Sequence, residues 1–213
     1  MIYTKEIGNP KDIAFAILDI ETTDLDNKVE EIVNVGIIEC TKDFSIVRGT
    51  DYWFNPTNRM ISVGASAATG LTNYMVHMMS GGDLFTAVQE KLKQHLLDLK
   101  VSVPIIAHNS KFDIPFIDMQ FNRWGDSINL SQGNIIDSIE IARRFRENGK
   151  DSLSLDNLMK TYNIDSFLVE LITAQVSQNK LARHTGIYDC VATMLLLKEL
   201  AAKAGGSDIS ALI

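Results

Sequence analysis

The chain has 213 residues and a formal net charge of −7 at pH 7, a length typical of one domain or slightly more. No apolar run reaches the ~20 positions of a membrane-spanning helix, which argues against membrane insertion. The absence of a basic tail argues against a tight grip on long duplex nucleic acid, which requires many Lys and Arg contacts to phosphates. We therefore expect one domain over residues 1–213, with a core over about 13–203 and a frayed tail over 204–213.

The cysteines favour an intracellular, cytoplasmic protein. Cys40 and Cys190 lie in apolar surroundings and match no metal-ligand spacing, so we expect them to be reduced thiols in the core. The segment Met1–Lys11 mixes charge, Gly and Pro, which is not the pattern of a secretory signal peptide.

The N-terminal half predicts strands. Apolar and β-branched residues fill three segments that are joined by short links, as expected for an antiparallel meander: Ile13–Asp19, Glu31–Thr41 and Phe44–Phe54. Tyr52, Trp53 and Phe54 end the third strand, and we interpret them as core residues rather than a base-stacking platform. Residues 55–82 are rich in Gly, Ser and Asn and predict irregular structure.

The second half alternates helices with short strands. Asp83 is placed to cap a helix over Leu84–Leu99, whose apolar residues keep helical spacing. Further helices are predicted over Lys111–Arg123, 137–146 (with Asp137 as its cap), Leu155–Tyr162, Phe167–Val176 and Thr185–Lys203, and short strands over Val103–Ala107 and Asn134–Ile136. This order predicts an α/β fold in which helices flank a mixed sheet of antiparallel and parallel strands.

Carboxylates gather where these strands end. Asp19 and Glu21 are two residues apart at the end of a buried strand, so their side chains leave the same face. Asp113 closely follows the strand Val103–Ala107 and would lie beside Asp19 if the two strands are parallel neighbours. Asp189 approaches from the last helix, and His184, five residues earlier, is expected in the loop that leads into it.

Carboxylates this close repel one another unless protons or cations neutralise them. Hard divalent ions prefer such oxygen ligands. Two ions about 4 Å apart stabilise the attacking and leaving oxygens of a phosphoryl displacement, and a histidine accepts a proton from water near neutral pH. The residue types therefore favour phosphodiester hydrolysis.

Three segments carry a resemblance to a known family: Leu18–Thr23 (LDIETT), Ala107–Asp113 (AHNSKFD) and His184–Asp189 (HTGIYD). They resemble the three exonuclease motifs of the DEDD superfamily, in its His-containing branch. Ser154–Leu158 (SLDNL) is similar to the family's segment ahead of the third motif. The resemblance covers about residues 13–200 and implies a ribonuclease-H-like fold and a 3′→5′ exonuclease.

The resemblance also implies roles. Asp19, Glu21, Asp113 and Asp189 would hold two Mg²⁺ or Mn²⁺ ions, with Asp19 bridging them, and His184 would be the general base. Thr22, Thr23 and Leu25 would bind the 3′-terminal nucleotide, with Leu25 wedged against its base. The partners implied are single-stranded or frayed 3′ ends of DNA, with RNA left open, and a DNA polymerase.

Some positions depart from the family or admit other interpretations. Asp24 stands where the family often has Gly, and Gly186 where it often has Ala, which would lower helix propensity beside His184. His108 is a rival base, although we expect it to pack or to cap a helix. Arg143, Arg144, Arg146 and Lys150 would guide a single strand or, as we favour, form a solvated face.

Two other functions remain open at this point. One is a catalytically idle ribonuclease-H-like module of a polymerase or RNA-processing complex, and the other is an endonuclease of the wider ribonuclease-H-like group. The complete set of mutually repelling carboxylates disfavours the idle module.

Overall fold

The computed structural model describes residues 1–146, 152–177 and 185–213. Within them, six strands form one mixed sheet in the order β1-β4-β3-β2-β5-β6. The strands are β1 Ile2–Glu6, β2 Phe15–Thr22, β3 Ile32–Cys40, β4 Ile46–Trp53, β5 Ile105–Ala107 and β6 Ile135–Asp137. The pairs β1–β4, β3–β4 and β2–β3 are antiparallel, whereas β2–β5 and β5–β6 are parallel. The predicted meander and parallel extension are both confirmed.

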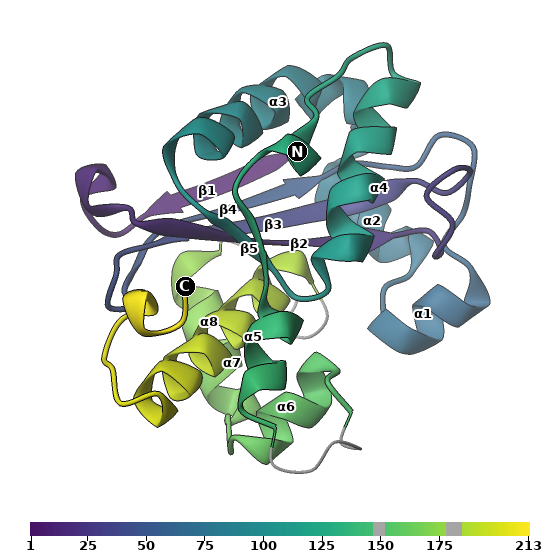
Figure 1. Cartoon of the computed structure of the whole chain (residues 1–213). Coiled ribbons are helices and arrows are strands. Elements are labelled where there is room, and N and C mark those ends of the chain that lie inside the picture. Colours follow the sequence, from purple (N-terminus) through teal and green to yellow (C-terminus); the bar gives the residue numbers. More distant parts are fainter. Residues whose placement is uncertain (147–151, 178–184) are drawn as a thin grey trace.

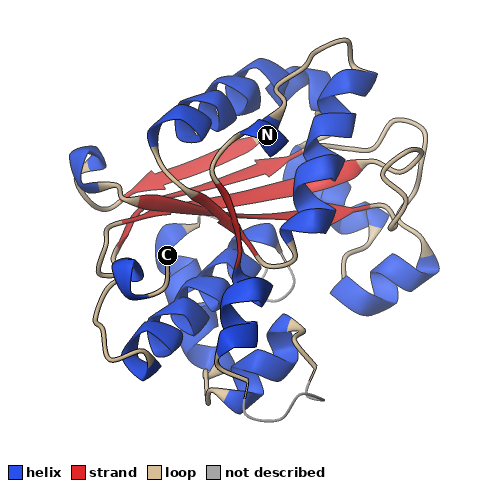
Figure 2. Ribbon diagram, viewed as in Figure 1, coloured by secondary structure: helices blue, strands red, loops and turns tan. Residues whose placement is uncertain are grey.

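Helices cover both faces of this sheet (Figures 1 and 2). The α-helices are α1 Val63–Thr69, α2 Asn73–Ser80, α3 Phe85–Ser102, α4 Ser110–Arg123, α5 Ser138–Arg144, α6 Leu155–Thr161, α7 Ser166–Val176 and α8 Gly186–Lys203. Short 3₁₀ turns occupy Pro10–Asp12, Leu130–Gln132 and Ile209–Ala211. Helices α3 and α4 cover one face, and α5 to α8 lie on the other (Figure 1). No helix in the described ranges is long and apolar enough to span a bilayer.

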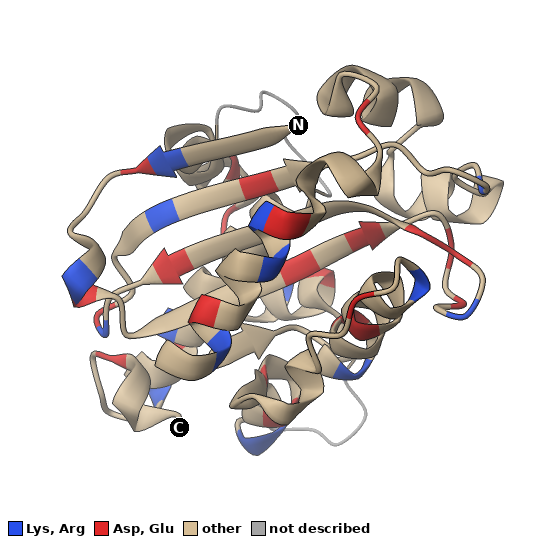
Figure 3. Cartoon of the chain, turned by 90° about the horizontal axis from the view of Figure 1, so that it is seen from above, with Lys and Arg blue, Asp and Glu red and all other residues tan. Residues whose placement is uncertain are grey.

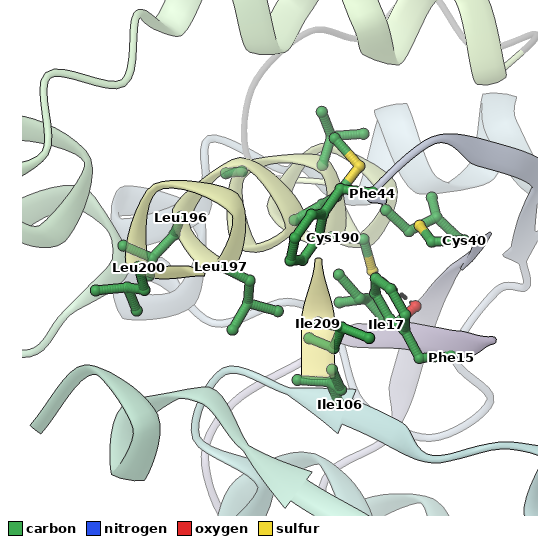
Figure 4. Packing of buried hydrophobic residues seen from close by; sticks show 14 of the residues in the cluster. Phe15, Ile17, Cys40, Phe44, Ile106, Cys190, Leu196, Leu197, Leu200 and Ile209 are labelled. Carbon is green, nitrogen blue, oxygen red and sulfur yellow. Dashed lines mark hydrogen bonds between the residues drawn. The ribbon is translucent and has the colours of Figure 1, made fainter. Parts of the chain in front are cut away.

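Helix α8 is the central element of the second layer. Twelve of its eighteen residues are buried, because it is enclosed between the sheet and α6 and α7. Leu196, Leu197 and Leu200 extend from α8 into a cluster with Phe15 and Ile17 of β2 (Figure 4). Burial of such side chains contributes about 1.5–3 kcal/mol each. This packing fixes the helix that carries Asp189 against the strand that carries Asp19.

The N-terminal segment and residues 55–82 differ from the sequence expectation. Residues 2–6 form β1, an edge strand that is largely exposed and is held by its pairing with β4. Helices α1 and α2 occupy part of the segment predicted to be irregular; each is short, capped by a side chain (Ser62 and Thr72), and ended by a left-handed glycine. Short elements with few apolar residues carry little periodic signal, so the composition pointed to a loop.

Two local predictions are wrong. Asp83 does not cap α3: the N-cap is Leu84, without a side-chain hydrogen bond, and the Asp83 carboxylate instead pairs with the N-terminal amine at 2.9 Å. The segment 204–213 is not frayed. Ile209 and Leu212 are buried, and Arg144 donates a hydrogen bond to the Leu212 carbonyl at 2.9 Å. These two apolar side chains and the hydrogen bond from Arg144 dock the tail.

Candidate active site

Strand β2 delivers the first pair of carboxylates. Its centre is fully buried between β3 and β5, and Asp19 and Glu21 follow Leu18 as the strand nears its end. Their cross-strand partners on β3 are Gly36 and Asn34. The register shifts between Glu21 and Thr22, which ends regular pairing just beyond the two acids.

Helix α8 brings Asp189 to the same point. Thr185 is the N-cap, and its hydroxyl accepts the Tyr188 N–H at 3.4 Å. Asp189 therefore lies in the first turn, where the helix dipole favours negative charge. One carboxylate oxygen from each of Asp19, Glu21 and Asp189 lies within 4.8 Å of the other two. These three acids, up to 170 positions apart, form one cluster.

Asp113 lies next to this cluster rather than in it. It belongs to the first turn of α4, which follows β5 after a left-handed residue, Asn109. Because β5 runs parallel to β2, the two strand ends meet at one edge of the sheet, as expected for ligand sites of α/β folds. The side chain of Asp113 is only 2% exposed, and its charge raises the pKa of both Asp19 and Glu21.

A further carboxylate orients the start of α4. Asp137, at the end of β6, accepts hydrogen bonds from the Asn109 N–H at 3.1 Å and the Ser110 hydroxyl at 3.2 Å. It also caps α5 by accepting the Ile139 N–H, as the sequence predicted. One side chain thus fixes two helix starts, and its charge adds to the field at Asp113.

Burial and mutual repulsion hold these carboxyls toward their protonated form. Burial, followed by the charges of Asp113 and Asp189, raises the pKa of Asp19 well above its usual value. Burial is likewise the main cause that raises the pKa of Glu21. It also raises the pKa of Asp113 to about 8 and, together with the charge of Asp156, that of Asp189 to about 7.

This donor set fits divalent cations. In the described ranges, no Lys or Arg forms an ion pair with any of the four carboxylates. Buried carboxylates of like charge require neutralisation, and oxygen donors within 4.8 Å of one another suit Mg²⁺ or Mn²⁺. Asp19, Glu21 and Asp189 would hold one cation directly, with Asp113 at the edge of the site.

The segment after β2 is partly available to a substrate. Leu25 is 77% exposed, as a wedge residue must be. Thr22 is half-buried and donates from its hydroxyl to the Asp24 carbonyl at 2.8 Å. Thr23, by contrast, is fully buried: its hydroxyl donates to Glu30 and accepts the Glu31 N–H. That hydroxyl holds the loop together, and the role of Thr23 in binding the substrate stays a prediction.

The two candidate bases differ. His184 lies outside the described residues. His108 has both ring nitrogens engaged, with Nδ1 2.8 Å from the Ser138 hydroxyl and Nε2 2.9 Å from the Leu153 carbonyl. Because a carbonyl only accepts, Nε2 carries the proton. Burial lowers the pKa of His108, and the ring packs as the sequence suggested.

The aromatic and basic residues that were considered as nucleic-acid contacts have structural partners wherever the structure describes them. Tyr52, Trp53 and Phe54 are buried, as expected of core residues. Arg143 pairs with Glu140, and Arg144 holds the C-terminal turn. On the face drawn in Figure 3, Lys and Arg positions are scattered among acidic ones rather than gathered in one band. Lys150 lies outside the described residues.

Sequence reasoning missed three polar residues near the site. Asn34 and Asp51 are fully buried and bonded to each other at 2.6 Å, and the charge of Asp51 raises the pKa of Glu21. Asp156 acts on Asp189. The available signal was a lone polar residue inside an apolar strand, as in Val33-Asn34-Val35, because such a residue is buried only with a partner.

Comparison with known proteins identifies the family. The model of the exonuclease family (RNase_T) matches residues 16–197. The DNA polymerase III PolC-type protein of Staphylococcus saprophyticus is 27% identical over 197 residues, which cover 90% of this chain and 12% of that protein. The Staphylococcus epidermidis protein of the same name is 26% identical over 186 residues, which cover 87% of this chain and 11% of it. The chain thus spans about a tenth of these relatives.

Solved structures agree on the fold. Escherichia coli exonuclease I, in complex with a dT13 oligonucleotide, superposes with a TM-score of 0.69 at 18% identity, covering 89% of this chain and 42% of that one. A complex of exonuclease I with an SSB C-terminus superposes with a TM-score of 0.67 at 17% identity, covering 88% of this chain and 41% of that one. The fold is therefore ribonuclease-H-like. With the family's carboxylates gathered at one sheet edge, this chain belongs to the exonuclease family as a DEDD-type exonuclease domain.

Proposed function

We propose that this domain is a metal-dependent 3′→5′ exonuclease that removes nucleotides from single-stranded or frayed 3′ ends of DNA. The observation that carries the proposal is the buried cluster of Asp19, Glu21 and Asp189, with Asp113 beside it. Such a cluster is costly for a folded protein and has no purpose in an idle module. The carboxylate cluster suits divalent cations that bind a phosphodiester.

The chain's own residues have distinct tasks in this reaction. The four carboxylates would hold two Mg²⁺ or Mn²⁺ ions, which when bound lower the pKa of water and stabilise charge on phosphate oxygens. His184 would accept the proton of the attacking water. The water oxygen bonds to phosphorus as the bond from phosphorus to the preceding 3′ oxygen breaks, so a nucleoside 5′-monophosphate leaves.

The choice of DNA rests on similarity. The relatives are named DNA polymerase III, and exonuclease I has been solved with dT oligonucleotides. We infer that this domain acts in DNA replication in association with a polymerase, in the cytoplasm. RNA remains the alternative substrate, to be tested directly, because discrimination depends on contacts to the 2′-OH.

We expect the protein to contact only a few phosphates of the substrate strand. The net charge is −7, and the described basic residues form no continuous band on the face in Figure 3. With two or three phosphate contacts, single-strand affinity should fall with log salt at a slope of about −1.4 to −2.1. Dissociation between cuts would then produce a ladder of intermediates. A slope several times steeper would indicate a longer binding track.

The deciding experiment uses 5′-labelled DNA and RNA oligonucleotides of one sequence with Mg²⁺, Mn²⁺ or EDTA. A ladder that shortens from the 3′ end, is abolished by EDTA and is absent in Asp19→Asn supports the proposal. Internal cuts would identify an endonuclease, and intact substrate under all conditions an idle module. Protection by a blocked 5′ end, but not by a blocked 3′ end, would reverse the direction.

A further inference from the structure

The side chain of Asn34 connects the sheet to the start of α8. It is fully buried on β3, where its cross-strand partner is Glu21. Its Oδ1 accepts the Gly186 N–H at 2.8 Å. Its Nδ2 donates to Asp51 Oδ1 at 2.6 Å and to the Tyr52 carbonyl at 3.0 Å. Because the Gly186 N–H is a donor only, the carbonyl end of the Asn34 amide must face it.

The backbones of β3 and α8 approach too closely for side chains at this point. A Cβ added to Gly36 would lie 2.1 Å from the Ile187 nitrogen. A Cβ added to Gly186 would lie 2.7 Å from both the Asp19 carbonyl oxygen and the Gly36 nitrogen. The first residue of α8 therefore lies directly on β2, which carries Asp19 and Glu21, and on β3 beside it. Asn34 supplies the directional bond in that contact.

This contact sets where Asp189 lies. Asp189 is three residues after Gly186, nearly one helical turn. Sliding the helix by one residue would move it 1.5 Å along the axis and turn it by about 100°. Bound metals tolerate only about 0.2 Å in ligand distance. Apolar packing holds α8 against the sheet but is non-directional, so the hydrogen bond from a fixed strand adds a directional constraint on the rotation of the helix at Gly186.

We propose that Asn34 is a positioning residue for cation binding: it fixes the start of α8 so that Asp189 meets Asp19 and Glu21. The inference rests on the proposed function, since it assigns these carboxylates to cations. Outer residues that orient metal ligands typically contribute 10–100-fold to metal affinity or activity. We expect a loss of this size when Asn34 cannot accept the Gly186 N–H.

The test compares the wild-type protein with Asn34→Leu, whose side chain has the same branching and number of heavy atoms but no hydrogen-bond acceptor. Tyr52→Phe is the matched control. Tyr52 lies on β4, next to β3, and its hydroxyl is hydrogen-bonded to His95 of α3 at 2.9 Å. The substitution removes this bond and leaves the contact of Asn34 to α8 intact. Mn²⁺ affinity is measured by titration calorimetry without substrate. The values of kcat and KM are measured on a single-stranded oligonucleotide, and folding is checked by circular dichroism.

We expect Asn34→Leu to bind Mn²⁺ about 10–100-fold more weakly, with reduced kcat, little change in KM and recovery of activity at high Mn²⁺. Because Mn²⁺ would also refold a partly unfolded variant, circular dichroism without Mn²⁺ distinguishes that case from a folded protein whose metal site is weakened. Tyr52→Phe should bind Mn²⁺ as the wild type does. If Asn34→Leu does not fold, Asn34→Ala takes its place, because the smaller side chain leaves room for a water that accepts the Gly186 N–H. A water does not fix the helix as a side chain on β3 does, so Asn34→Ala should show the same loss of Mn²⁺ affinity and kcat.

Two results separate the two proposals. A folded Asn34 variant with wild-type Mn²⁺ affinity and kcat overturns the positioning role while the exonuclease remains. Wild-type protein that neither binds Mn²⁺ nor degrades the oligonucleotide overturns the proposed function itself.

Discussion

Asp19 of β2 and Asp189 of α8 present carboxylate oxygens within 4.8 Å of each other, although 170 positions separate them in the chain. Both groups are repelled by further acids, and burial adds to the cost of their charge. Two side chains held in this way are destabilising by themselves and become favourable when a cation lies between them.

Divalent cations should stabilise the fold. An ion that binds only the folded state adds about 2.7 kcal/mol at a hundredfold excess over its dissociation constant. Thermal melts in Mn²⁺ should therefore show a higher Tm than melts in EDTA. Asp19→Asn should shrink this difference and, by removing one repelling charge, raise the Tm in EDTA. Identical melts for both proteins under both conditions would argue against a metal site.

The stability of the metal-free protein should fall as pH rises through neutrality. The usual pKa of an aspartate, 3.8, is raised to about 8 for Asp113 and to about 7 for Asp189. The folded state thus holds protons that the unfolded chain has released, so this stabilisation is complete below about pH 4 and is lost by about pH 8. Tm measured in EDTA across this range should decline.

Asp113→Asn serves as the control for that pH series, since it should flatten the decline. Saturating Mn²⁺ should reverse the trend, because protons compete with the metal for the carboxylates. A Tm in EDTA that rises steadily from pH 5 to 8 would contradict the assigned shifts.

Replacing His184 should affect chemistry rather than folding. His184→Ala is expected to keep the Mn²⁺-dependent rise in Tm and to lose roughly 10²–10⁴-fold in kcat, the usual contribution of a general base. His108→Ala should instead lower the Tm, because it leaves the Leu153 carbonyl and the Ser138 hydroxyl without their partner. Near-normal activity in His184→Ala, with a large loss in His108→Ala, would mean that the base is misassigned.

Leu25 should contribute to substrate binding without contributing to stability. Its side chain is 77% exposed, so Leu25→Ala should leave the Tm unchanged. Loss of its contact with a terminal base should raise KM by about 10-fold, as expected for about 1.4 kcal/mol of lost apolar burial. Val101→Ala, 82% exposed at the end of α3, is the control and should leave KM unchanged. Equal KM values in all three proteins would exclude the wedge role.

Gly186→Ala should destabilise the protein even though Gly186 lies in a helix. Alanine is favoured over glycine in helices by about 1 kcal/mol, but a Cβ here would lie 2.7 Å from the Asp19 carbonyl oxygen. Gly64→Ala in α1 is the matched control, since its Cβ would meet only the Ser62 hydroxyl at 3.7 Å, and we expect it to raise the Tm. A higher Tm for Gly186→Ala would show that α8 and β2 can move apart to admit the Cβ without loss of stability.

The sequence by itself determined the elements that have strong local signals. The apolar run before Asp19 predicted a buried strand, and the helical spacing of apolar residues over 84–99 predicted α3. The segments that carry Asp113 and Asp189 were also predicted to be helices. The motif residues Asp19, Glu21, Asp113 and Asp189 were identified by their types and order, and for three of them the structure brings the carboxylates together.

Only the tertiary structure decided which polar groups are in use. Nothing in the sequence indicated that the hydroxyl of Thr23 is hydrogen-bonded within its own loop. Gly186 looked like a weak point in a helix, yet it is the residue that lets α8 touch β2 and β3. Asn34 had no motif at all. Local patterns report burial and periodicity, whereas hydrogen-bond partners and close backbone approach depend on segments that are distant in sequence and meet only when the chain has folded.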